Sequence, residues 1–165
     1  MNGVSFTELM RYTDLETAKW RIFLNSIGPK ALDIEVDTAG MKDVRGVLLH
    51  IFAVELRYSE RLLELEKVTE YEALPTGSLD ELFGIYAKAR ANYREWLGRT
   101  SEHDLAKVMT FGTRTAGTLS ASKRKILIHA MLHGVRHWAQ MANTLRLRGY
   151  KQDWMHDFLM TDAME

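Results

Sequence analysis

Three of the six histidines recur at steps of four residues in one stretch of helical pattern: His129, His133 and His137, with Gln140 three residues beyond the last. Because a step of four advances only about 40° around a helix, the rings and the amide share one narrow stripe. Two imidazoles one turn apart can reach a single metal ion while the backbone stays regular. This HxxxH spacing is typical of a pair of metal ligands.

Two imidazoles alone bind an ion weakly, so a third ligand has to come from another helix. His50 is the best candidate, because it is the only histidine of the predicted second helix and lies at the edge of its apolar face. A second interpretation stays open from spacing alone, in which the histidines form a polar stripe with ordinary hydrogen bonds and no ion. The HExxH signature of metalloproteases is absent.

Two long amphipathic segments in the first half of the chain must position His50. The first is predicted over residues 6–27, where Ser5 and Glu8 form a capping box and Gly28 ends the helix. The second is predicted over about residues 44–67, because its apolar residues repeat at steps of three and four.

Two further segments complete the helical pattern. The third helix begins after Ser78, which forms a second capping box with Glu81. The fourth begins near Ser120 or Ser122 and ends at Gly149. Four amphipathic helices with short links predict an all-α fold, a four-helix bundle whose core is built from the facing apolar stripes.

The helical pattern lapses between Asp104 and Leu119, where Thr and Gly are frequent. These residues disfavour helix and suit either a small β-hairpin or an extended loop before the last core helix, turning near Ala116-Gly117. The dozen residues between the first two helices are read as a connection. The segment after Gly149 is read as a short helical turn or an extended tail.

Four aromatic residues at helical spacing, Trp20, Tyr86, Tyr93 and Trp96, are expected in the core rather than beside a metal. His156 near the C-terminus would approach the other histidines only if the tail folded back over them.

Length and composition set outer limits on the function. The 165 residues suit one domain, residues 1–165, and the 22 basic and 22 acidic side chains cancel, which disfavours nucleic acid as a partner. The absence of cysteine excludes disulfides, thiolate metal sites and cysteine nucleophiles. No apolar run approaches the ~20 residues of a membrane span, and no signal peptide is recognisable. We expect a cytoplasmic protein without a membrane partner.

The predicted fourth helix resembles the last core helix of the DinB-like family. The family pattern is approximately H-x-x-x-H-x-x-x-H-R-G-Q followed by L-R-x-x-G, and this chain reads HAMLHGVRHWAQMANTLRLRG. The second helix, VRGVLLHIFAVELRYSERLL, is similar to the family's segment with a single metal-binding histidine, which corresponds to His50. The chain departs from the pattern at Trp138-Ala139, where many relatives have Arg-Gly, so the role of that arginine is not carried over.

The resemblance implies that the metal ligands are His50, His133 and His137, with water completing the coordination. His129 then lies outside the coordination sphere, and Gln140 is a candidate for orienting His137 or the bound water. Three imidazoles leave positions open for a substrate. One divalent ion is expected, Zn²⁺ or Ni²⁺ first and Fe²⁺ or Mn²⁺ as alternatives, since imidazole suits several metals.

The resemblance further implies a metal-dependent enzyme with a small-molecule substrate, because the family contains thiol-dependent transferases and isomerases. The most concrete interpretation is a transferase that uses a low-molecular-weight thiol as co-substrate, and a hydrolase is its nearest alternative. The competing interpretation is a non-catalytic, metal-dependent binding or stress-response module. We also expect a homodimer.

Overall fold

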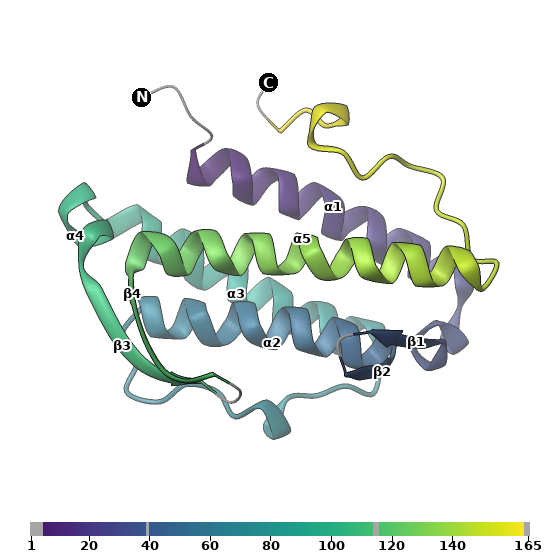
Figure 1. Ribbon diagram of the computed structural model, residues 1–165, viewed down its shortest axis with the longest axis horizontal. Helices are drawn as coiled ribbons and strands as arrows, with labels where there is room; N and C mark the ends of the chain where they lie inside the picture. Colours follow the sequence, from purple (N-terminus) through teal and green to yellow (C-terminus); the bar gives the residue numbers. More distant parts are fainter. Residues whose placement is uncertain (1–4, 39, 114–115, 164–165) are drawn as a thin grey trace.

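A computed structural model describes residues 5–38, 40–113 and 116–163. Four long helices lie along the long axis of the molecule and form its main body (Figure 1). Helix α2 packs against both α3 and α5, and α1 packs against α5 and, less extensively, α3. The predicted helical bundle is confirmed. The helices are α1 (Phe6–Ile27), α2 (Val44–Leu62), α3 (Leu79–Arg99) and α5 (Lys123–Leu147).

The predicted capping residues set three of the helix starts. The Ser5 hydroxyl accepts a hydrogen bond from the Glu8 amide while the Glu8 side chain accepts one from the Ser5 amide, and Ser78 and Glu81 repeat this arrangement before α3. Ser122, the later of the two proposed starts, caps α5 through the amide of Lys125. Each cap satisfies amides that have no partner within the first helical turn.

Helix α2 ends at Leu62 rather than near Lys67, so the predicted end was wrong. Glu64 adopts a φ of 59°, and its amide donates to the carbonyl oxygen of Arg61 at 2.9 Å, which closes the last turn. A side chain other than glycine is uncommon in this left-handed conformation. Because Glu64 is not a helix-ending residue by type, the sequence carried no signal for this stop.

The stretch before the last helix contains the predicted β-hairpin. Strands β3 (Val108–Thr113) and β4 (Gly117–Ser122) pair antiparallel in a continuous register, and a short helix, α4 (Glu102–Ala106), precedes them. Strand β4 continues directly into α5, since Ser122 is both its last residue and the helix cap. The hairpin is therefore attached to the helix that carries three of the histidines.

The connection between α1 and α2 contains regular structure that the sequence analysis did not predict. A 3₁₀ turn (Pro29–Asp33) leads into a second small hairpin, formed by β1 (Glu35–Thr38) and β2 (Met41–Asp43). Gly40 has a φ of 78° at its turn, and Val36 is fully buried. Strands of three or four residues are too short to show a periodic pattern, which explains why they were missed.

The C-terminal segment folds back along α1 (Figure 1). Trp154 donates its indole hydrogen to the Glu16 carboxylate at 3.2 Å, His156 contacts the same carboxylate, and the Tyr12 hydroxyl donates to the His156 carbonyl oxygen at 2.8 Å. A 3₁₀ turn (Phe158–Met160) follows. The tail thus folds back as envisaged, but His156 is held by α1 and not beside the other histidines.

The aromatic residues expected in the core lie there. Trp20, Tyr93 and Trp96 are at most 3% exposed, and Tyr86 packs against the core from its edge. Trp20 stacks on Trp138 of α5 with ring centroids 5.2 Å apart. This stack is the main aromatic contact between α1 and α5.

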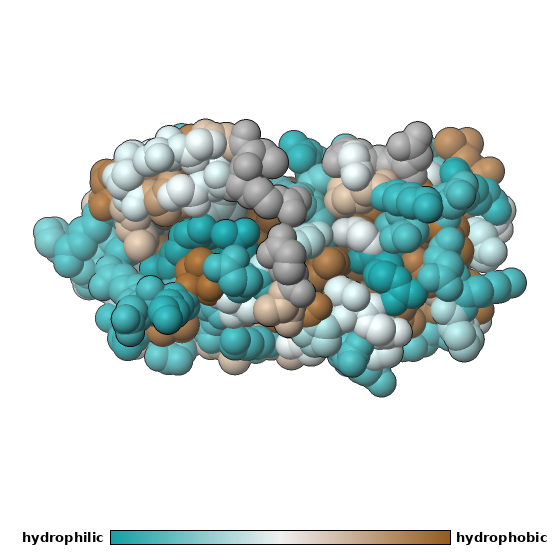
Figure 2. All heavy atoms as spheres, turned by 90° about the horizontal axis from the view of Figure 1, so that it is seen from below, coloured by the Kyte–Doolittle hydropathy of each residue, from teal (hydrophilic) through white to brown (hydrophobic). Residues whose placement is uncertain are grey.

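Two features of the described residues bear on possible partners. None of the described helices is long and apolar enough to cross a lipid bilayer. On the face seen in Figure 2, hydrophobic residues are scattered among hydrophilic ones over the coloured part of the chain. The homodimer stays a prediction.

A cluster of contacts around the buried Arg90 joins all four long helices. Arg90 of α3 is 1% exposed and lies 3.0 Å from Glu55 of α2 and 3.4 Å from Asp14 of α1, while one of its amino groups contacts the Met131 sulfur of α5 at 2.8 Å. Burial raises the pKa of Glu55 to about 7, although the charge of Arg90 opposes that rise. The guanidinium and its carboxylates therefore connect the helices through one buried cluster.

Replacing Arg90 by methionine should lower the free energy of unfolding by about 3 kcal/mol, because the buried Glu55 loses its counterion. The loss should be smaller at about pH 5 than at about pH 8, since a protonated Glu55 needs no counterion and stability falls as the pH rises toward its raised pKa. Urea unfolding followed by circular dichroism measures both values. The matched control is Arg94→Met, which removes an exposed partner of Asp14 and should cost less than about 1 kcal/mol. Equal losses would contradict the assignment.

Candidate metal centre

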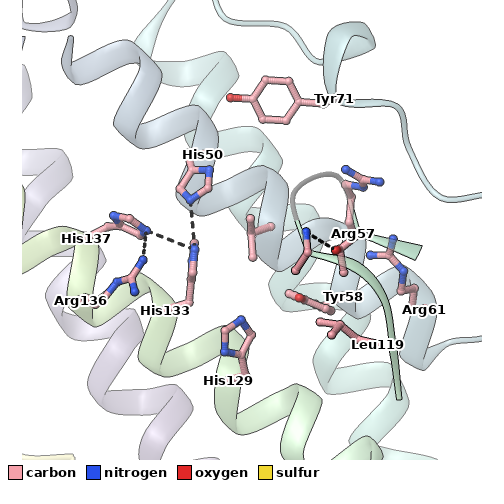
Figure 3. A pocket seen from close by; sticks show the side chains of 13 residues that line it. His50, Arg57, Tyr58, Arg61, Tyr71, Leu119, His129, His133, Arg136 and His137 are labelled. Carbon is pink, nitrogen blue, oxygen red and sulfur yellow. Dashed lines mark hydrogen bonds between the residues drawn. The ribbon is translucent and has the colours of Figure 1, made fainter. Parts of the chain in front are cut away.

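Three histidine side chains from two helices meet at one point. His50 extends from α2, and His133 and His137 extend from successive turns of α5, with their rings turned toward one another (Figure 3). The Nε2 atom of His133 lies 3.1 Å from that of His50 and 3.2 Å from that of His137. All three ligand atoms lie within 4.8 Å of one another.

Two of these separations fit the coordination of one ion. Imidazole nitrogens bound to zinc at about 2.0–2.1 Å in tetrahedral geometry lie about 3.3 Å apart. Two of the three nitrogen–nitrogen separations, 3.1 and 3.2 Å, are close to that value, and all three are within 4.8 Å. The three histidines could therefore hold a metal ion.

The electrostatics of the cluster favour the neutral forms of His133 and His137. Burial and the neighbouring histidines lower the pKa of His133 to about 3. Burial, and the charge of Arg136, also lower the pKa of His137, which is fully buried. A neutral imidazole with a free lone pair is the form that binds metal. A cation at the common point satisfies three lone pairs at once, whereas a hydrogen bond between two of the nitrogens satisfies one.

A glycine brings the two helices close enough for this meeting. A Cβ atom added to Gly134 would lie 3.2 Å from a Glu55 carboxylate oxygen and 3.6 Å from the Ile51 Cγ2 atom, both on α2. Gly134 directly follows His133, so the close approach occurs at the level of the histidines. A larger residue there would push α5 away from His50.

A cavity of about 450 Å³ opens beside the cluster, with all three histidines in its wall. Its other polar walls come from α2, α5 and the connection after α2, and the β3–β4 hairpin adds Thr113, Ala116 and Leu119. Figure 3 shows Arg57 and Arg61 on the side of the cavity away from His137. The histidine cluster is thus accessible from a space that suits a small molecule.

His129 and Gln140, the two residues expected outside the coordination sphere, lie beside the three histidines. His129 lines the cavity, with its ring centroid 5.7 Å from that of His133 and 5.5 Å from that of Tyr58. Burial lowers its pKa. The Gln140 Oε1 atom is buried, as are the Nδ1 atoms of His133 and His137, and none of these three atoms has a hydrogen-bond partner within the described part of the chain.

Sequence reasoning missed the arginines of the cavity. Arg57 and Arg61 follow His50 by about two and three helical turns, so they lie on the same face of α2, and this spacing could have identified them. Arg136 immediately precedes His137, and its Nη2 atom lies 3.3 Å from the His137 Nε2 atom. This chain therefore has an arginine before that histidine, while the buried Trp138 occupies the position after it.

Gly134→Val should destabilise the fold by about 2 kcal/mol, because the added methyl groups overlap the Glu55 and Ile51 side chains. It should also weaken zinc binding, since His50 is separated from the α5 histidines. Denaturant unfolding and competition with a chromophoric chelator measure the two effects. Gly84→Val is the matched control. That helical glycine is exposed, and a Cβ atom added to it would meet no heavy atom within 4 Å. Zinc affinity that is the same in both variants would contradict this account of Gly134.

One of the comparisons with known proteins identifies a family for the chain. No curated protein matches the chain. The family model described as the DinB family matches residues 1–164, which include all three histidines and all four long helices. The chain belongs to the DinB family.

Proposed function

We propose that the chain is a metal-dependent enzyme that transfers a low-molecular-weight thiol to a small-molecule substrate. His50, His133 and His137 hold its one divalent ion. The observation that carries the proposal is the position of three converging Nε2 atoms in the wall of an open cavity of about 450 Å³. A closed structural site would instead use up its coordination positions on protein ligands.

A divalent ion bound there would lower the pKa of a coordinated thiol or water and so supply a nucleophile at neutral pH. Imidazole ligands suit Zn²⁺ or Ni²⁺ first, with Fe²⁺ or Mn²⁺ as alternatives. The neutral histidines leave the positive charge of the site uncompensated. Arg136, whose Nη2 atom lies 3.3 Å from the His137 Nε2 atom, adds a further positive charge that favours an anionic donor atom.

We assign an orienting role to Gln140. Its Oε1 atom is a buried acceptor without a partner, and the Nδ1 atom of His137, one turn earlier on the same helix, is a buried donor without a partner when Nε2 binds a metal. The two side chains lie within hydrogen-bonding reach of each other, because burial lowers the pKa of His137 and an interaction with Gln140 opposes that fall. Such a hydrogen bond fixes the tautomer of His137 and raises its basicity.

A non-catalytic, metal-dependent binding module is the second candidate. It is favoured by one observation: the described residues that line the cavity include no aspartate or glutamate that could act as a general base. A module of this kind would retain a small ligand without turnover. The cytoplasmic location and the homodimer expected from the sequence stay predictions.

Protein purified without a histidine tag should contain about one divalent ion per chain, measured by elemental analysis. His133→Ala should lose most of the metal, because its Nε2 atom contacts both other ligands. The control is His103→Ala, which removes an exposed histidine of the short helix α4. Equal metal content in His133→Ala and in the unmodified protein would contradict the metal proposal.

Thiol transfer is tested with the metal-loaded protein, using glutathione, bacillithiol or mycothiol with monochlorobimane as electrophile. At least one thiol should give turnover that His133→Ala lacks and His103→Ala keeps. If metal is retained but no thiol reacts faster than with His133→Ala, the transferase proposal fails and the binding module remains. The two measurements therefore separate metal binding from catalysis.

A further inference from the structure

Three arginines line the same cavity as the metal cluster: Arg57 and Arg61 of α2 and Arg136 of α5. No carboxylate occurs among the described lining residues, and none of the three arginines forms an ion pair with a described carboxylate. Elsewhere among the described residues, eleven lysine and arginine side chains pair with acidic ones. The cavity therefore concentrates positive charge in a chain whose net charge is zero.

Contacts with strand β3 and with Tyr58 of α2 hold Arg61 in the cavity wall. Its guanidinium lies 5.0 Å from the centroid of the Phe111 ring and 5.7 Å from that of Tyr58, and one amino group donates to the Gly112 carbonyl oxygen at 3.1 Å. Burial, and then the charge of Arg57, lower the pKa of Arg61. The guanidinium is thus fixed in place beside another cation.

Arg57 supplies a hydrogen-bond donor without an acceptor. Its Nε atom is buried and has no hydrogen-bond partner within the described residues. An unsatisfied buried donor on a charged group is costly, and an oxyanion that enters the cavity would satisfy it. Because Arg57 and Arg61 lie one helical turn apart, a single carboxylate can reach both guanidinium groups.

We propose that the substrate or thiol bound in this cavity is a small organic anion whose carboxylate is held by Arg57 and Arg61. Its donor atom is directed at the three-histidine cluster, beside Arg136. Planar guanidinium groups bind a carboxylate through paired hydrogen bonds, which makes them selective for shape as well as charge. This assignment rests on the proposed function, because it takes the histidine cluster as the reactive end of the cavity.

The test compares two thiols by calorimetry with the full-length, zinc-loaded protein. Mercaptosuccinate carries a thiol and two carboxylates, and 1-thioglycerol carries a thiol and no charge. Mercaptosuccinate should bind at least about tenfold more tightly, the order expected for one charge-assisted hydrogen bond in a water-accessible cavity. Equal affinities in the unmodified protein would overturn the proposal.

Two variants locate the carboxylate. Arg57→Gln and Arg61→Gln should each lose about tenfold in affinity for mercaptosuccinate and keep their affinity for 1-thioglycerol. Arg21→Gln is the control, because it removes the same charge from an exposed arginine that pairs with Asp80 outside the cavity. If Arg61→Gln folds poorly, Arg61→Lys takes its place, since it keeps the charge and loses the paired geometry. Affinities unchanged in both cavity variants would overturn the assignment.

Metal-free protein separates this inference from the proposed function. Succinate, which has the carboxylates and no thiol, should still bind to it, and Arg57→Gln should weaken that binding. If the purified protein holds no metal while succinate binding depends on Arg57, the metal proposal fails and the anion site stands. If metal is retained while neither anion depends on the arginines, the anion site fails and the metal proposal stands.

Discussion

The close packing of α2 against α5 is the contact on which the candidate site depends. His50 lies on one of these helices and His133 on the other, so the Nε2 atoms meet only if the helix axes approach closely. Gly134 allows that approach because it presents no side chain to Glu55. Since an interior helical glycine costs about 1 kcal/mol relative to alanine, intrinsic helix stability is lower at the point where the ligands converge.

The same carboxylate connects the site to the rest of the bundle. Glu55 contacts Gly134 on one side and the buried guanidinium of Arg90 on the other, and Arg90 also reaches Asp14 of α1. The position of α2 relative to α5 is therefore coupled to the positions of α1 and α3. Because an unpaired charge in the core is costly, displacements that separate Glu55 from Arg90 are disfavoured. Such precision suits a set of ligands that must converge within about 0.5 Å.

Patterns that extend over several turns, or that use residues with a direct capping role, were readable from the sequence. The bundle, the capping boxes at Ser5 and Ser78, and the HxxxH pair of α5 belong to this class. The stop of α2 at Glu64 and the β1–β2 hairpin were not readable, because each depends on tertiary contacts that few residues encode. The cavity arginines were missed for another reason. Their spacing from His50 was visible, but charged residues on a helix face are ordinarily solvated, and only the position of the hairpin encloses them.

The wall of the cavity has two parts, one from the long helices and one from the β3–β4 hairpin. The metal-ligating candidates and the arginines all project from long helices, whereas Thr113, Ala116 and Leu119 come from the hairpin. Helical positions are constrained by the core behind them, while strand and turn residues in a two-stranded ribbon accept changes in size and length more readily. The histidine cluster and the hairpin part of the cavity wall thus come from separate stretches of the chain. An exchange of this two-stranded ribbon alone would change the shape of the cavity and leave the three histidines in place.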